Sequence, residues 1–200
     1  MRMSLASIFT VLLLVLSPLS CGADLVKGQD AYNSGDYQTA IAEWQPLADG
    51  GDAEAQFGMG QLYANGFGVP LDDNEALKWY LLAADQQHAN AQCNIAVMHA
   101  NGWGVAQSDD EAYKWYILAA EQGIIEAQNA VAKMHFGGFG AEQSNVQAHK
   151  WYNIASELGD LNAASKRDDL VPKMSAEELA EAEQLASTWL ENYQTLRANQ

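Results

Sequence analysis

The sequence predicts an all-α fold: an α-α superhelix (solenoid) of tandem 36-residue helix–turn–helix repeats with a C-terminal capping helix. Three observations support this prediction. A Lys-Trp-Tyr motif occurs three times at intervals of 36 residues, a Gly-x-Gly turn recurs at the same interval, and a polar helix-capping residue precedes the second helix of each copy. Self-similarity at a fixed period of this length is the sequence signature of helical repeat proteins.

The Lys-Trp-Tyr motifs are expected to supply the structural core between neighbouring repeats, with these aromatic residues: Trp79, Tyr80, Trp115, Tyr116, Trp151 and Tyr152. Trp115 belongs to the central copy, so we expect it to pack against both neighbours. Small residues recur at the helix contacts, where they let helix axes approach to about 8–10 Å. They are Gly60, Ala96 and Ala132 on the first helices, and Ala76, Ala112 and Ala148 on the second.

Each repeat is predicted to contain two helices. In the first copy, the first helix runs from about Asp52 to Ala64 and ends at Gly66, because glycine readily takes the left-handed conformation that closes a helix. The second helix starts at Asp72 and ends near Gln87, with equivalent ends at Gly123 and Gly159. Capping boxes are predicted at the starts of the three second helices: Asp72 with Glu75, Ser108 with Glu111, and Ser144 with Gln147.

Each copy follows the pattern Ala-x-x-x-Φ-small-x-x-Tyr/His-x-x-Gly-x-Gly-Val and then Ala-x-Lys-Trp-Tyr-x-x-Ala-Ala-x-x-Gly. This pattern resembles the Sel1-like repeat, a relative of the tetratricopeptide repeat. The resemblance implies a solenoid that acts as an adaptor in assembly or signalling. His99 and His135 replace the family tyrosine present at Tyr63, and the third copy has Gly140-Ala141 in place of Gly-Val. The three copies lie within residues 53–162, at about 53–88, 89–124 and 125–160.

The flanks resemble imperfect repeats. Residues 24–52 are predicted to form a degenerate N-terminal helical hairpin, and residues 163–200 to form C-terminal capping helices. Val171-Pro172 ends a segment similar to the first helix of a fourth copy, and Ser175 with Glu178 caps the last helix. The apolar stripe of that helix should cover the open end of the array: Leu179, Ala182, Ala186, Trp189, Tyr193 and Leu196.

Residues 1–23 have the layout of a secretory signal peptide. Arg2 precedes an uncharged apolar run from Leu5 to Leu16, and cleavage after Ala23 would leave Asp24 first. The run is shorter than the roughly 20 residues of a membrane span, so no transmembrane span is expected in the mature chain. We therefore predict an exported protein, periplasmic or secreted. A retained N-terminal anchor and a lipoprotein acylated at Cys21 are the alternatives.

The composition excludes some partners. The chain has 10 basic and 26 acidic residues, a formal net charge of −16, and no cluster of Lys and Arg that could follow a nucleic-acid backbone. After loss of residues 1–23, Cys93 is the single cysteine, so no internal disulfide can form. Cys93 lies on the hydrophobic pattern of a helix and is expected to be a buried packing residue.

No motif for catalysis, metal binding or a cofactor is found. His99 and His135 occupy equivalent positions one repeat apart, too far for one zinc ion, and are expected to fill the tyrosine position. Some members of the Sel1-like family are linked to β-lactam binding, which keeps a cell-envelope enzyme or small-ligand binder as the alternative function. The chain lacks their cysteine pairs and the Ser-x-x-Lys nucleophile motif.

One feature is left for binding a partner. An aromatic residue lies between the two glycines of each interhelical turn: Phe67, Trp103 and Phe139. Exposed rings would form a column of anchors for a partner, whereas rings folded onto their own helix pair would be core residues. The sequence thus predicts a non-catalytic, exported scaffold that binds a protein or peptide of unknown identity on the solenoid surface.

Overall fold

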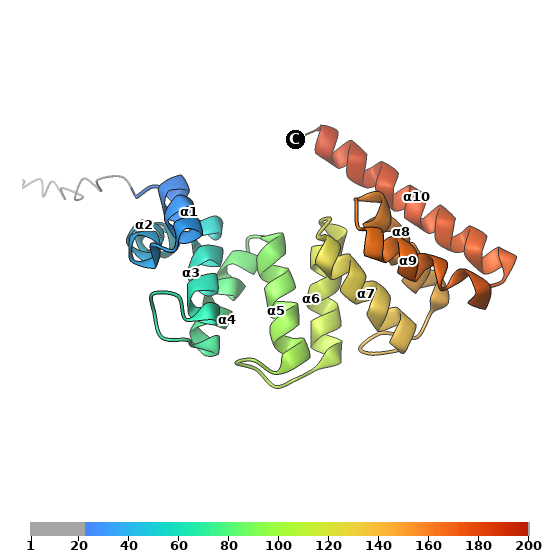
Figure 1. Cartoon of the computed structure of the whole chain (residues 1–200), viewed down its shortest axis with the longest axis horizontal. Coiled ribbons are helices and arrows are strands. Elements are labelled where there is room, and N and C mark those ends of the chain that lie inside the picture. Colours follow the sequence, from blue (N-terminus) through green and yellow to red (C-terminus); the bar gives the residue numbers. More distant parts are fainter. Residues whose placement is uncertain (1–22, 200) are drawn as a thin grey trace, which may run out of the picture.

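The computed structural model describes residues 23–199, so the signal-peptide prediction and the Cys21 alternative fall outside the described residues except at Ala23. The described chain is entirely helical, which confirms the predicted fold class. The helices follow one another along an arc, with α1 and α2 at one end and α8–α10 at the other (Figure 1). They are α1 (Leu25–Ser34), α2 (Tyr37–Asp49), α3 (Ala53–Asn65), α4 (Asp73–Ala84), α5 (Ala89–Asn101), α6 (Asp109–Glu121), α7 (Ile125–Gly137), α8 (Asn145–Glu157), α9 (Leu161–Asp168), the 3₁₀ turn η1 (Val171–Lys173) and α10 (Ala176–Ala198).

The three repeats are α3–α4, α5–α6 and α7–α8. Their first helices end at left-handed glycines, Gly66, Gly102 and Gly138, as predicted. The second helices end two or three residues earlier than expected. The residues predicted to be their last have a left-handed backbone conformation, which cannot continue a right-handed helix. These positions are Gln87 (φ 65°), Gly123 (φ 92°) and Gly159 (φ 110°).

The capping prediction is half right. Asp72, Ser108 and Ser144 each accept a hydrogen bond from the backbone N–H three residues later. A capping box also needs a second hydrogen bond, from the backbone N–H of the capping residue to the side chain three residues later. Among the described helices this bond is found in α10, where the Ser175 N–H donates to the Glu178 carboxylate. In α4 and α6 the glutamates pair instead with lysines one turn further on, Glu75 with Lys78 and Glu111 with Lys114.

In the first two Lys-Trp-Tyr motifs the Trp and the Tyr pack in opposite directions along the array, whereas Trp151 and Tyr152 of the third motif belong to one cluster. Trp115 packs on the cluster formed by buried residues of α4 and α5, whereas Tyr116 packs on the C-terminal cluster, which includes Cys93 and the buried residues of the third repeat. The prediction that Trp115 contacts both neighbours is therefore wrong, because adjacent positions on a helix point about 100° apart. Gly60 brings the helices close: a Cβ there would lie 2.5 Å from the Tyr80 ring. The other five small residues of the helix contacts are fully buried.

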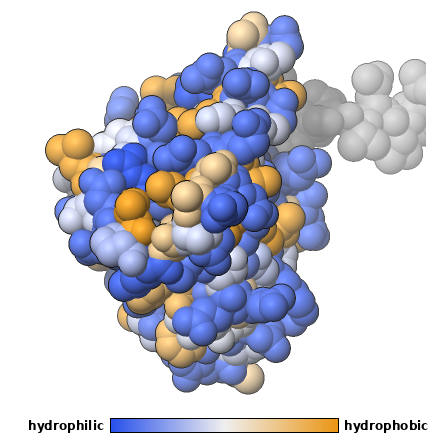
Figure 2. Space-filling view, turned by 90° about the vertical axis from the view of Figure 1, so that its right-hand side faces the viewer, coloured by the Kyte–Doolittle hydropathy of each residue, from blue (hydrophilic) through white to orange (hydrophobic). Residues whose placement is uncertain are grey.

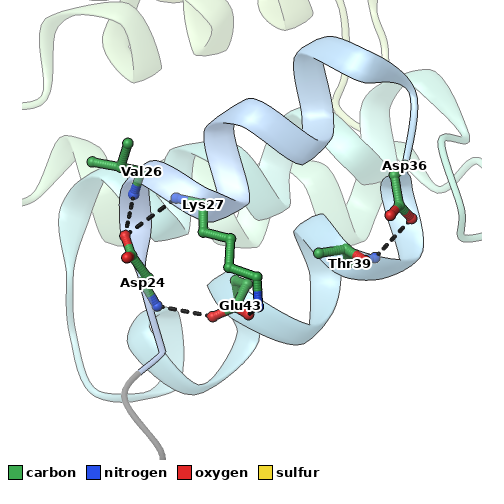
Figure 3. A network of polar contacts seen from close by, with 6 residues as sticks. All are labelled: Asp24, Val26, Lys27, Asp36, Thr39 and Glu43. Atoms are coloured by element: carbon green, nitrogen blue, oxygen red, sulfur yellow. Dashed lines mark hydrogen bonds and ion pairs between the residues drawn. The ribbon is translucent and has the colours of Figure 1, made fainter.

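The N-terminal hairpin is joined by polar contacts as well as by packing. The carboxylate of Glu43 on α2 pairs with Lys27 on α1 and accepts a hydrogen bond from the backbone N–H of Asp24 (2.9 Å) (Figure 3). Asp24 also caps α1 through its side chain. Trp44 is buried beneath α1 and donates its indole N–H to the Leu25 carbonyl (3.3 Å).

At the other end, α10 runs back across α8 rather than beside α9 (Figure 1). Ala182 and Ala186 are fully buried, and Trp189 meets Trp151 edge-on with ring centroids 6.0 Å apart. The predicted stripe fails at Leu196, which is 64% exposed because α10 extends beyond the helix that it covers. Figure 2 shows this end of the molecule, where hydrophobic residues form small patches separated by hydrophilic residues.

Candidate partner-binding surface

The three turn aromatics lie in two different environments. Phe67 is half-buried and stacks on Tyr37 of α2, with ring centroids 4.5 Å apart and planes 9° from parallel. Trp103 and Phe139 are 50% and 55% exposed. Phe67 therefore belongs to the N-terminal hydrophobic cluster, and the predicted aromatic column has two exposed members.

The difference arises from the residue that faces each turn. The second glycine of every turn packs on the start of the preceding second helix, where a Cβ would lie within 2.8 Å of Tyr37, Asp73 or Asp109. These three residues are themselves 36 positions apart. Tyr37 offers a ring on which Phe67 can stack. Asp73 and Asp109 offer no such ring, and Trp103 and Phe139 stay half exposed. One side of the Phe139 ring lies over Gly137 of its own helix, where a Cβ would be 2.2 Å from the ring.

Two pockets open beside the half-exposed rings. The first interrepeat pocket, about 300 Å³, lies among α3, α4 and α5 and contains Asp73, Tyr80 and Trp103. The second interrepeat pocket, about 250 Å³, lies one repeat further on and contains Asp109, Tyr116 and Phe139. In both, a tyrosine of a Lys-Trp-Tyr motif and a methionine of the next first helix (Met98 or Met134) contribute to the lining.

A third interrepeat pocket, about 200 Å³, continues the row where α9 replaces a repeat's first helix. Tyr152 and Leu170 hold the positions of the tyrosine and methionine. Phe136 stands where the first two pockets have alanine, and the ammonium of Lys173 lies 4.8 Å from its ring centroid. Lys166 lies 5.6 Å from the ring centroid of Tyr152. The pockets thus repeat every 36 residues while their charges change along the row.

Two of the four histidines form structural hydrogen bonds. His88 caps α5 by accepting the backbone N–H of Ala91 (3.2 Å), a role that the sequence analysis missed. His135 is buried between the Tyr113 hydroxyl (3.1 Å) and the Glu142 carbonyl (3.0 Å). Within residues 23–199, no group of three or more His, Cys, Asp or Glu side chains is placed to hold a metal ion.

Cys93 is buried, as predicted, and burial raises the pKa of its thiol to about 11. A thiol with so high a pKa is almost entirely protonated at neutral pH and is a poor nucleophile. None of the helices in the described part of the chain is long and apolar enough to cross a bilayer.

Comparison with known proteins agrees with this architecture. The Sel1 repeat family model matches residues 53–88, 89–124 and 125–160, together more than half of the chain. The chain belongs to the Sel1 repeat family. Sel1 repeat arrays are generally scaffolds for protein–protein contacts. No curated protein matches the chain.

Solved structures with the same fold include a Sel1 repeat protein from Oxalobacter formigenes, with 31% identity and a TM-score of 0.70, covering 72% of this chain and 59% of that one. A protective antigen present in uropathogenic Escherichia coli strains, which displays an SLR fold, has 25% identity and a TM-score of 0.50, with coverage of 78% and 42%. The chain spans less than two thirds of the length of both proteins.

The sequence analysis found the rims of the pockets but missed their linings. Trp103 and Phe139 stood out because they lie between turn glycines. Met98 and Met134 were not singled out, although they too recur at the 36-residue interval. That periodicity, read together with the tyrosines, is the signal that could have located the pockets.

Proposed function

We propose that this Sel1 repeat protein is a non-catalytic scaffold that binds a polypeptide segment along the row of interrepeat pockets. The observation that carries the proposal is the repetition of one pocket at the 36-residue interval, with the exposed rings of Trp103 and Phe139 at the rims of the first two. A repeated pocket suits an extended ligand that presents side chains at intervals, and a solenoid offers a long surface for such a ligand.

Aromatic residues are effective anchors because their large rings lose little conformational entropy on binding. Phe67 is a less suitable contact, since stacking on Tyr37 already occupies one face of its ring. We therefore assign the principal contacts to Trp103 and Phe139 and a minor one to Phe67. An enzyme or small-ligand binder of the cell envelope is the less favoured alternative, because the pocket linings contain no activated nucleophile beside a base.

The test is the double variant Trp103→Ser with Phe139→Ser, compared with wild type in thermal melting and in partner capture from envelope extract. Exposed rings contribute little to stability, so melting should be nearly unchanged. Loss of two anchors should lower capture markedly, since one anchor can contribute about 2 kcal/mol, or thirtyfold in affinity. Unchanged melting together with unchanged capture would place the binding surface elsewhere.

Export is the second part of the proposal. Cleavage after Ala23 would leave an α-ammonium on Asp24, whose backbone nitrogen already donates to the Glu43 carboxylate. A positive charge at that nitrogen would strengthen the contact. Intact-mass measurement of the envelope-fraction protein should give a chain that begins at Asp24. Full-length protein recovered from the cytosol would contradict export, and a diacylglycerol adduct on Cys21 would identify a lipoprotein.

A further inference from the structure

Charged residues are distributed unequally along the interrepeat pockets. Asp73 is the charged residue of the first pocket, the second pocket has Asp109 and Lys133, and the third has Asp169 with Lys166 and Lys173. The lining therefore changes from net negative, through neutral, to net positive along the row.

Five of the nine basic residues that the structure describes have no ion pair with a carboxylate, and three of the five line this row; the other two are Lys150 and Arg197. Four basic residues elsewhere form ion pairs with carboxylates: Lys27, Lys78, Lys114 and Arg167. Lys133, Lys166 and Lys173 have no such ion pair within the described residues. Lys166 and Lys173 lie instead over aromatic rings of the third pocket. Two ammonium groups held at one pocket can both reach one bound carboxylate.

The first pocket has the opposite chemistry. Asp73 and the exposed ring of Trp103 line the same hollow, and no lysine or arginine does. A carboxylate beside an indole ring suits a cationic side chain, which gains both an ion pair and a cation–π contact.

We infer that the ligand of this row is an extended polypeptide segment with a cationic side chain at the first pocket and a carboxylate side chain at the third. This inference rests on the proposed function and adds the charge pattern and the direction of the segment. We assign the carboxylate to a side chain because each pocket of a repeated row receives a side chain from a segment that passes over it. Neighbouring pockets are on the order of 10 Å apart by helix packing, which is about three residues of an extended strand.

The experiment selects from a displayed pool of random twelve-residue peptides with free C-termini, using the full exported protein. Selected peptides should carry Lys or Arg toward one end and Asp or Glu about six residues away. The best peptide should bind Lys166→Gln/Lys173→Gln and Asp73→Asn about tenfold more weakly than wild type. The matched control Lys78→Gln/Lys114→Gln removes two lysine charges elsewhere and should bind like wild type. Amidation of the peptide's C-terminus should leave affinity unchanged.

The outcomes separate this inference from the proposed function. Peptides that need Trp103 and Phe139 but show no charge pattern, or that ignore Lys166 and Lys173, would overturn the inference and leave the binding surface intact. Loss of affinity on amidation would overturn the assignment to a side chain. If no peptide is selected, or if the selected peptides ignore Trp103 and Phe139, both the inference and the proposed binding surface are wrong.

Discussion

The two ends of the array and its middle use the same repeat positions differently. At the N-terminal end Phe67 stacks on Tyr37, and at the C-terminal end Trp151 is 1% exposed beneath α10. In the middle, Trp103 is half exposed and Trp115 is half-buried. The repeat motif decides which residue type stands at each position. The neighbouring element decides whether that residue is core or surface.

Leu118 and Ile154 give the same comparison on the second helices. They are equivalent residues one repeat apart. Leu118 on α6 is 48% exposed, whereas Ile154 on α8 is fully buried. The terminal elements of this array therefore differ from its repeats: they cover the two ends, while the repeats leave the middle accessible.

The largest expected difference between the end and the middle concerns the tryptophans. Trp151→Ala should lower the free energy of unfolding by about 3–5 kcal/mol, the usual cost of removing a buried large aromatic side chain. Trp115→Ala should cost clearly less, because part of its ring is already in water. Denaturant unfolding of both variants measures the two values. Equal costs would show that α10 does not cover the third repeat as described.

The turn aromatics should differ in the same sense. Phe67→Ser should destabilise the protein by roughly 1–3 kcal/mol, since it removes apolar burial and a stacked ring pair. Trp103→Ser should change stability by no more than about 0.5 kcal/mol, as exposed positions usually do. A large loss for Trp103→Ser in thermal unfolding would make that ring a core residue and remove it from the binding surface.

Exchanging the residue that faces the turn should convert one environment into the other. Asp73→Tyr places a ring where Tyr37 stands at the N-terminal end, and stacking with Trp103 should add up to about 1 kcal/mol of stability. It should also reduce acrylamide quenching of the Trp103 fluorescence, measured as the difference from a Trp103→Phe control. Unaltered quenching would mean that the facing residue does not determine exposure.

The covered end should also respond to pH. Burial and the positive charge of Arg167 lower the pKa of His149, although Glu183 of α10 and Asp168 act in the opposite direction. His149 is therefore harder to protonate in the folded protein than in the unfolded chain, where its pKa has the ordinary value of 6.5. As the pH falls below 6.5, the unfolded chain takes up the proton first, and the free energy of unfolding decreases. His149→Gln should flatten this decrease, measured by unfolding between pH 7 and 5. Parallel curves for the two proteins would contradict this role.

The sequence predicted the fold well because its signals are local and repeated. The 36-residue interval, the turn glycines and the N-caps depend on neighbouring residues in the chain, and the structure confirms them. The path of α10 could not be predicted, because its apolar stripe specifies a covered surface without saying which surface it covers. Leu196 was misassigned for that reason.

The site was predicted less completely. Whether a turn ring is exposed depends on a residue 30 positions earlier: Tyr37 for Phe67 and Asp73 for Trp103. That pairing becomes visible only when consecutive repeats are stacked. The charge change along the pockets was hidden for the same reason, since it combines residues from α4, α6, α7, α9 and η1.

The most direct test of an open, binding-competent middle between covered ends is hydrogen exchange of the protein with and without its selected peptide. We predict that the peptide slows exchange around residues 94–104 and 130–140, which border the first two interrepeat pockets, and leaves α1 and the middle of α10 unchanged. Slower exchange confined to the terminal elements, with none around Trp103 and Phe139, would contradict the assignment of the binding surface to the row of pockets.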